Sequence, residues 1–594
     1  MQPATSQAGS RERNDSPWLG GSSEASPVFL AFQELERRLG AAGVLPGAPI
    51  APTTALGALM DWWVHLAASP AKQWELAQYA AEQGLRAVQA ANGPHAEIDA
   101  LPQDKRFADA AWQAAPYRWL AQAFLLQEQW WHKATTGVPG VTRHHEQMAS
   151  FAARQWLDMV APSNFVTTNP VVRQRTLQEG GMNLLRGAMH VAEDACREVL
   201  DQPPVGAEQF EPGRNVAITP GRVVLCNRLM ELIQYEPATK TVRPEPVLLI
   251  PAWIMKYYVL DLSETNSMVK FLVNQGFSVF AISWKNPDAT DRDLCMDDYA
   301  RLGVLAALDA IRAIVPDARV HATGYCLGGT LLATVAAALG RSNRQALKTV
   351  TLLAAQTDFT EPGEIALFVD EGQIAFLERQ MWQRGYLDKS QMKSTFQMLR
   401  SNDLVWSHRL HNQLLGERAP VTDLMAWNAD GTRLPYRMHV EYLRGLFLDN
   451  ALARGEWKVE GTAVNLADIT VPIFNVGTVQ DHVAPWRSVF KLQALTDAPQ
   501  TFVLTAGGHN VGIVNPPGQA KSSYRLRQRS ASDRLLTPDE WLQTTPPVAG
   551  SWWSAWAGWL ARHSGRRGPP PAMGAPQAGL PPLDAAPGLY VHQR

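Results

Sequence analysis

Three side chains in the second half of the sequence have the types and the order of a nucleophile, an acid and a base. Cys326 lies in "HATGYCLGGTLL", Asp481 in "VPIFNVGTVQDHVAPW" and His509 in "TFVLTAGGHNVGIVNPP". Each follows a short apolar run typical of a buried β-strand, so all three are expected at strand ends. A thiol, a carboxylate and an imidazole in this order are typical of enzymes that form an acyl intermediate. The sequence therefore predicts covalent chemistry at Cys326.

The glycines around Cys326 indicate an abrupt turn from a strand into a helix. Gly324 and Gly328 would relieve crowding at such a turn and leave the sulfur at the helix N-terminus. There the free N–H groups and the helix dipole stabilise a thiolate, and the Leu327 N–H can also bind an oxyanion. The alternative is an ordinary small core cysteine, which the box alone leaves open. Asp481 and His509 favour the catalytic interpretation.

The other members of the site follow from their positions. His509 is expected to accept the Cys326 proton and later to act as a general base, while Asp481 orients its imidazole. A second oxyanion donor is expected in the loop "LLIPAWIMKYY", where we favour the Ile254 N–H; the alternative is a plain apolar loop end. The neighbouring His482 is interpreted as a surface or packing residue.

The elements that position these residues belong to an α/β fold. The runs "PVLLIPA", "FSVFAISW", "ARVHATG", "TVTLLAA", "VPIFNVG" and "TFVLTAG" alternate with helical segments such as 262–275, 296–314 and 327–339. Apolar strands that alternate with helices indicate a mostly parallel sheet, with the site at the carboxyl ends of its strands. Residues from about 361 to 468 interrupt the alternation and contain helical stretches, which predicts a cap over the strand ends.

The remaining segments complete the predicted domain organisation. Residues 1–25 are interpreted as a disordered leader, 26–205 as a helical N-terminal domain and 206–563 as the catalytic domain. The Pro-, Gly- and Ala-rich residues 564–594 are predicted to be flexible and unpacked. Aromatic stripes that include Trp62, Trp63, Trp130 and Trp131 indicate helix packing or a partner surface rather than a cofactor site.

Composition excludes several classes of function. Lys and Arg total 54 against 56 Asp and Glu among 594 residues, so no basic excess points to nucleic acid. The four scattered cysteines form no C-x-x-C pair, which argues against zinc and a disulfide framework. Residues 1–26 lack the apolar stretch of a secretory signal, so export is not expected, and the weakly charged run 323–340 fits a buried helix better than a membrane span. We expect a cytoplasmic protein without a transmembrane segment, a metal or a bound cofactor.

Around Cys326, Asp481 and His509 the sequence resembles the polyhydroxyalkanoate synthases. The resemblance covers most of the chain and includes "DKRFADAAWQ", "SNFVTTNPVV", "FEPGRNVAITPGRVV", "SVFAISWKNPD", "GYCLGGTLL", "LRSNDLVW", "AWNADGTRLP" and "GHNVGIVNPP". So many collinear matches are far more specific than the cysteine box alone. Ala252 and Met255 depart from the family pattern, in which proline and asparagine are frequent, so a polar substrate contact at Met255 is not expected.

The resemblance implies an α/β-hydrolase core with a helical cap insertion and a helical N-terminal domain. It also implies polymerisation of (R)-3-hydroxyacyl-CoA into a polyester with release of coenzyme A, and it places the nucleophile, acid and base on Cys326, Asp481 and His509. The length and box look like class I, which prefers short monomers such as 3-hydroxybutyryl-CoA. Further implications are a homodimer, granule-associated protein partners and a location at the surface of the polyester granule. A thioesterase, a depolymerase and an inactive granule scaffold remain alternatives.

Overall fold

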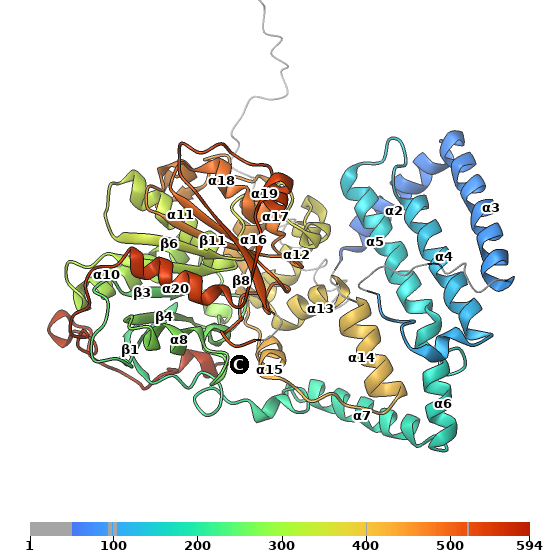
Figure 1. Ribbon diagram of the computed structural model, residues 1–594, viewed down its shortest axis with the longest axis horizontal. Helices are drawn as coiled ribbons and strands as arrows, with labels where there is room; N and C mark the ends of the chain where they lie inside the picture. Colours follow the sequence, from blue (N-terminus) through green and yellow to red (C-terminus); the bar gives the residue numbers. More distant parts are fainter. Residues whose placement is uncertain (1–49, 93–97, 99–103, 400, 520–521) are drawn as a thin grey trace, which may run out of the picture. The chain divides into compact units, whose positions relative to one another are not determined.

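The computed structural model describes residues 50–92, 98, 104–399, 401–519 and 522–594. The predicted leader, residues 1–25, and the start of the predicted helical domain lie outside these ranges. Within them, the region that precedes the sheet is helical, as the sequence predicted. Its helices are α2 (Pro52–Ala67), α3 (Pro70–Asn92), α4 (Tyr117–Thr135), α5 (Arg143–Val160), α6 (Pro170–Gln178) and α7 (Met182–Val199) (Figure 1).

Local sequence explains where several of these helices begin. Proline is the first residue of α2 and α6, where its missing N–H costs nothing. The Asn169 side chain accepts hydrogen bonds from the Val171 and Val172 N–H groups, and Thr142 caps α5 in the same way. Arg106 ties the helices together, because its guanidinium contacts Asp104, Glu128 and Asp158. These contacts are partly buried, so charge pairing reinforces the apolar packing of the helices.

The second part of the chain forms a ten-stranded mixed sheet with the order β1-β2-β4-β3-β5-β6-β11-β12-β13-β14 (Figure 1). The six central strands, from β4 to β12 in this order, run parallel, and antiparallel strands flank them on both sides. The strands are β1 (Gly221–Cys226), β2 (Met230–Tyr235), β3 (Val247–Ile250), β4 (Val279–Trp284), β5 (Val320–Tyr325), β6 (Leu347–Leu353), β11 (Ile473–Thr478), β12 (Gln500–Thr505), β13 (Ser523–Arg529) and β14 (Pro547–Ala549).

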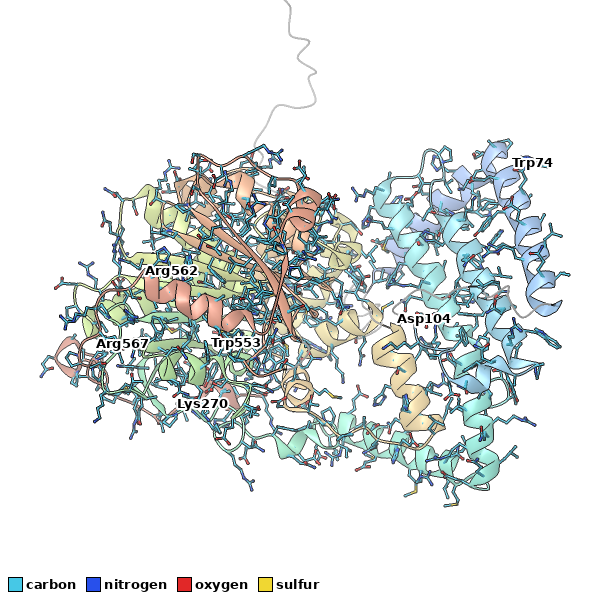
Figure 2. All side chains as sticks on the ribbon, in the orientation of Figure 1. Trp74, Asp104, Lys270, Trp553, Arg562 and Arg567 are labelled. Carbon is cyan, nitrogen blue, oxygen red and sulfur yellow. The ribbon has the colours of Figure 1, made fainter. Side chains whose placement is uncertain are left out.

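Helices between the strands cover the sheet. They include α8 (Met268–Asn274), α9 (Met296–Asp298), α10 (Ala306–Ile314), α11 (Leu327–Arg341), α17 (Trp486–Phe490), α18 (Leu492–Leu495), α19 (Pro538–Thr544) and α20 (Trp552–Arg562). The helix expected from residue 262 begins only at Met268, because Ser267 caps it. Figure 2 labels Trp553 on α20, whose ring lies 5.4 Å from that of Phe271 in α8. The tryptophans of α20 thus fill the core rather than a partner surface.

The interval between β6 and β11 is mainly helical and forms the predicted cap insertion. Its elements are α12 (Glu371–Arg384), α13 (Lys389–Leu399), α14 (Ser407–Arg409), α15 (Asp423–Ala429) and α16 (Tyr436–Tyr442), with short strand pairs β7 (Tyr386–Leu387) with β8 (Leu434–Pro435) and β9 (Lys458–Val459) with β10 (Thr462–Ala463). The ring of Phe368, just before α12, packs edge-on against Phe151 of α5. The cap therefore contacts both the sheet region and the N-terminal helices.

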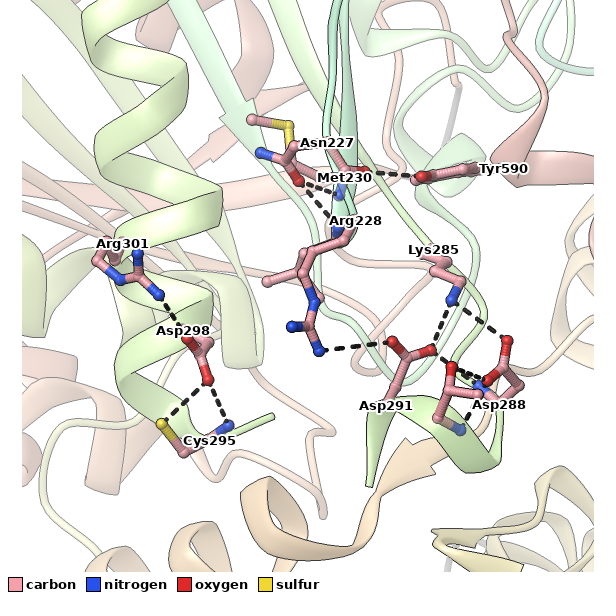
Figure 3. Close-up of polar contacts among 12 residues, drawn as sticks. Asn227, Arg228, Met230, Lys285, Asp288, Asp291, Cys295, Asp298, Arg301 and Tyr590 are labelled. Carbon is pink, nitrogen blue, oxygen red and sulfur yellow. Dashed lines mark hydrogen bonds and ion pairs between the residues drawn. The ribbon is translucent and has the colours of Figure 1, made fainter. Parts of the chain in front are cut away.

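The segment 564–594, which the sequence predicted to be flexible and unpacked, packs on the sheet, so that prediction is wrong. Its main chain pairs with the edge strand β1, since the Leu583 N–H donates to the Val223 oxygen at 2.7 Å. The Glu231 carboxylate accepts hydrogen bonds from the Leu589 and Tyr590 N–H groups. Figure 3 shows the Tyr590 hydroxyl donating to the main-chain oxygen of Asn227. Backbone groups make most of these contacts, which side-chain composition does not reveal.

The same segment reaches the loop after β3. The Lys256 ammonium donates to the main-chain oxygens of Tyr590 and Gln593 at 3.2 and 2.6 Å. Burial lowers the pKa of Lys256 to about 8, although Asp430 nearby opposes the shift. This lysine comes two residues after Ile254, so the segment helps to fix the loop in which we expect an oxyanion donor.

Candidate active site

Cys326 occupies the turn between strand β5 and helix α11. Its φ of +52° and ψ of −124° are unusual for a residue with a side chain. Hydrogen bonds hold the turn: the Cys326 N–H donates to the Leu353 oxygen at 2.8 Å, and its own oxygen accepts from Gly329 and Thr330. Only 9% of the residue is exposed. The strained turn thus presents the sulfur at one enclosed place, at the start of a helix.

The glycines around this turn are required by close main-chain approach. A Cβ on Gly324 would lie 2.4 Å from the Cα of Gly329, and one on Gly328 would lie 2.2 Å from the main-chain oxygen of Ile250. Neither separation is possible for real atoms, so any larger residue would force the backbone apart. This geometry agrees with the steric role expected for Gly324 and Gly328 in the sequence. It also brings the end of β3 directly against the first turn of α11.

Asp481 and His509 stand after strands β11 and β12 and form a direct pair. The distance from Asp481 Oδ2 to His509 Nδ1 is 2.8 Å. The other carboxylate oxygen accepts hydrogen bonds from the Val483 and Ala484 N–H groups at 3.0 and 2.8 Å. Burial alone would raise the pKa of Asp481, but His509 and these N–H groups outweigh it, and the pKa is lowered. The carboxylate is therefore charged and fixed in orientation.

The charge of His509 follows from its neighbours. Burial lowers the pKa of an imidazole, yet the Asp481 carboxylate and the sulfur of Cys326, which hydrogen-bonds to the ring, raise the pKa of His509 well above its usual value. The Tyr325 ring lies 5.5 Å from the imidazole, and the Tyr325 hydroxyl donates to the Asn510 side chain. The structure thus brings together the three residues that the sequence had placed some 180 positions apart, in an arrangement suited to a thiolate and an imidazolium.

The two expected oxyanion donors come to the same place. Leu327 is the first residue of α11, so its N–H has no acceptor within the helix. Leu327 and Ile254 both line the cavity that contains Cys326. The Ile254 loop is held by the cap, since the Thr432 hydroxyl donates to the Trp253 oxygen at 2.6 Å and the Thr432 N–H to that of Ile254 at 3.3 Å. Their role as donors stays a prediction.

The cavity over Cys326 lies between the sheet and the cap. Most of its lining is apolar, and the cap contributes Phe368, Leu377, Met392, Phe396, His439, Tyr442, Leu443 and Phe447. Sequence reasoning missed His439 and Tyr442. Both come from "YRMHVEY", which shows only the ordinary spacing of a helix, so no signal there marked them as cavity residues. An apolar enclosure of this kind favours acyl chemistry because it limits access of water to the nucleophile.

The described ranges contain neither a metal-binding cluster nor a helix that could span a membrane. No cluster of three or more histidine, cysteine, aspartate or glutamate side chains there is arranged to hold a metal ion. Among the same residues, no helix combines the length and the apolar character needed to cross a bilayer.

Comparison with known families and proteins places this geometry in context. Residues 103–272 match the model of the poly-beta-hydroxybutyrate polymerase (PhaC) N-terminus, and residues 245–516 match that of the alpha/beta hydrolase fold. The chain is 40% identical over 498 residues to a poly(3-hydroxyalkanoate) polymerase of Methylorubrum extorquens, which covers 83% of this chain and 81% of that protein. It is also similar to the poly(3-hydroxyalkanoate) polymerase subunits PhaC of Rhizobium meliloti, at 39% identity over 83% of this chain and 80% of that one, and of Cupriavidus necator, at 35% over 84% of each.

Proposed function

The chain belongs to the poly(3-hydroxyalkanoate) polymerase family, and from this premise we propose that Cys326 carries the growing acyl chain. The enzyme is an acyltransferase with an α/β-hydrolase core. We propose (R)-3-hydroxyacyl-CoA as its substrate, with short monomers such as 3-hydroxybutyryl-CoA preferred, and coenzyme A as the released product. The observation that carries the proposal is the contact of His509 with both Asp481 and Cys326 at the edge of an apolar cavity.

The loading step uses the geometry of the elbow. His509 takes the proton of the Cys326 thiol, and the thiolate attacks the thioester carbonyl carbon of the substrate. The carbonyl oxygen becomes an oxyanion that the Leu327 and Ile254 N–H groups can stabilise. When the bond to the coenzyme A sulfur breaks, His509 returns the proton to that sulfur. The acyl group is then linked to Cys326 by a thioester of similar energy, so it is held without being trapped.

Chain growth requires a hydroxyl group, not water, to attack an acyl thioester. In this proposal His509 accepts the proton of a 3-hydroxyl as the hydroxyl oxygen forms the new ester bond and the Cys326 thiolate leaves. Asp481 either orients His509 or acts as a second base toward the hydroxyl; its short bond to Nδ1 supports the first role. The apolar lining from the cap supports synthesis over hydrolysis, because water that entered would release a free hydroxy acid instead.

Partners and location extend the same proposal. We propose that the enzyme works as a homodimer at the granule surface in the cytoplasm and there meets granule-associated proteins. The support is the number of large apolar side chains left exposed on the N-terminal helices. Trp63 and Trp74 are 63% and 67% exposed, and Figure 2 labels Trp74 on α3. Exposed apolar groups in such number are typical of surfaces that bind a partner or an apolar phase.

Replacement of the proposed nucleophile tests the assignment. The variant Cys326→Ala should release no coenzyme A from 3-hydroxybutyryl-CoA. The control Cys196→Ala, which changes an exposed cysteine far from Cys326 in the sequence, should keep full activity. Polymer and free hydroxy acid are measured in the same reaction. Coenzyme A release that survives in Cys326→Ala would refute the proposal, and free acid without polymer would identify a hydrolase instead.

Selective alkylation separates an active enzyme from an inactive scaffold. Cys196 and Cys226 are exposed and Cys295 is half-buried, whereas Cys326 is buried. Exposure alone therefore predicts that Cys326 reacts last with a small reagent such as iodoacetamide at neutral pH. If His509 holds the proton, the thiolate makes Cys326 react first. Mass spectrometry of the alkylated peptides distinguishes the two orders.

A further inference from the structure

The polar side chains of the cavity differ in whether the protein satisfies them. The Thr330 hydroxyl donates to the main-chain oxygen of Gln356 at 2.8 Å, and the Gln356 side-chain amide donates to the Ser488 hydroxyl at 3.1 Å. The Gln391 side chain donates to the Gln380 side-chain oxygen and accepts from the Asp388 N–H, and the Thr395 hydroxyl donates to the main-chain oxygen of Gln391. The Gln373 side chain accepts from the Ala51 N–H at 2.6 Å. These groups are used in holding the cavity wall together.

His439 of α16 is different. The residue is 5% exposed and lines the cavity, yet among the described residues its Nδ1 is sealed from solvent without a hydrogen-bond partner. Its recorded contact is with the Tyr442 ring, one helical turn away, at 6.1 Å between centroids. Burial lowers the pKa of His439 to about 4, so the ring is neutral at neutral pH and carries one N–H donor and one acceptor nitrogen.

A second buried histidine shows what the protein does with an imidazole that serves the fold. His321 on β5 is fully buried, and both of its ring nitrogens have partners: Nδ1 lies 2.7 Å from Thr349 Oγ1, and Nε2 lies 2.9 Å from Ser564 Oγ. Buried polar groups are normally satisfied in this way. His439 Nε2 also makes no hydrogen bond among the described residues, and unlike Nδ1 it is not sealed, so a ligand in the cavity is the partner that can pair with it.

We propose that His439 recognises the 3-oxygen of the acyl group bound at Cys326, and this inference rests on the function proposed above. The carbonyl oxygen of that group faces the Leu327 and Ile254 N–H groups, which leaves the oxygen at carbon 3 as the one polar atom still to be matched. The cap wall is otherwise mostly apolar. Since Nδ1 is sealed, Nε2 is the ring nitrogen available to the substrate. His439 is then a specificity-determining residue, because an acyl group without the hydroxyl would leave it unpaired.

The test compares two substrates that differ by one oxygen atom. First-turnover release of coenzyme A is measured with (R)-3-hydroxybutyryl-CoA and with butyryl-CoA for the parent enzyme, His439→Phe and His439→Gln. The parent should prefer the hydroxylated substrate. His439→Phe should reduce that preference about 10-fold, through slower reaction of the hydroxylated substrate alone, because one neutral hydrogen bond is lost. His439→Gln, whose amide can still bond, should lie between the two.

The matched control is His321→Gln, which also removes a buried imidazole but away from the cavity lining. It should leave the preference unchanged, whatever it does to stability. An equal loss for both substrates in His439→Phe and His439→Gln, or an unchanged preference in both, would overturn the inference and make His439 a packing residue. Failure of the proposed function is a separate result, since it would appear as release of coenzyme A that does not need Cys326.

Discussion

The two walls of the cavity are built in different ways. On the sheet side, Cys326, Asp481 and His509 stand at strand ends, and main-chain hydrogen bonds and close backbone contacts fix their positions. On the cap side, apolar side chains such as Phe368, Leu377 and Phe447 make up most of the lining. Main-chain contacts define atomic positions closely, whereas apolar packing defines mostly volume. The sheet wall is therefore suited to reaction chemistry and the cap wall to the choice of substrate.

A histidine from each of these two regions, His509 after β12 and His439 in the cap, illustrates the difference. Both are buried, and burial pushes the pKa of each ring down. His509 has the Asp481 carboxylate and the Cys326 sulfur beside it, and its pKa rises well above the usual value. Among the residues that the structure describes, His439 has no such partner, and burial lowers its pKa to about 4. The charged neighbours thus decide whether a buried imidazole takes up and releases protons or only forms hydrogen bonds.

The change with the largest expected effect removes the carboxylate charge beside His509, so that this buried imidazole loses the neighbour that His439 also lacks. Asp481→Asn keeps the shape of the side chain but removes the charge that orients and stabilises the imidazolium. The corresponding change in serine triads lowers kcat roughly 10⁴-fold, and we expect a loss of roughly 10³- to 10⁴-fold in coenzyme A release. Initial rates with 3-hydroxybutyryl-CoA measure it, with thermal unfolding as the control for folding. A variant that keeps a tenth of the activity would contradict the role of Asp481.

The next change tests the rigidity of the two walls. A Cβ on Gly328 would meet the main-chain oxygens of Ile250 and Pro251 at 2.2 and 2.5 Å, whereas one on Gly431 in the cap would find nothing closer than 3.6 Å. Gly328→Ala should therefore lower the free energy of unfolding by at least about 4 kcal/mol, because backbone must move. Gly431→Ala should change it by less than about 1 kcal/mol. Denaturant unfolding of both variants measures the difference, and equal effects would refute it.

The smallest expected effect is a pH dependence of stability at the cap wall. The pKa of His439 is about 4 in the folded protein and about 6.5 in an unfolded chain. Between these values the unfolded chain binds more protons, so the stability due to neutral His439 is complete above pH 6.5 and is lost as pH falls to 4. This difference in pKa corresponds to a loss of about 3 kcal/mol in the free energy of unfolding.

The variant His439→Phe cannot take up this proton and should lose correspondingly less stability between pH 7 and pH 4. His509 acts in the opposite sense, because its raised pKa gives stability that is present below pH 6.5 and is lost only as pH rises through the folded value. The measurement is denaturant unfolding of the parent and the variant across this range. Parallel curves for the two proteins would mean that the pKa of His439 does not change on folding.

The triad could be predicted from sequence because its residues sit at strand ends, where a parallel sheet brings distant segments together. The glycines of "GYCLGG" mark the turn for a steric reason that the structure agrees with. His439 could not be found in this way, because its role depends on which face of α16 lines the cavity, and residue spacing does not show that. Composition led to the wrong prediction that residues 564–594 are unpacked. These residues pack through backbone hydrogen bonds, and their proline-rich sequence shows no hydrophobic period.

The packed segment also sets an order of events during synthesis. Leu589 and Tyr590 bind Glu231, which precedes them by some 360 residues, and Leu583 pairs with Val223 over a similar interval. A ribosome makes about 5 to 20 residues per second, so the edge strand β1 and its neighbour β2 wait on the order of 20 to 70 seconds for these partners. The N-terminal helices are complete well before then. We therefore expect the exposed sheet edge, and not the reaction site, to be the part of the nascent chain that most needs protection.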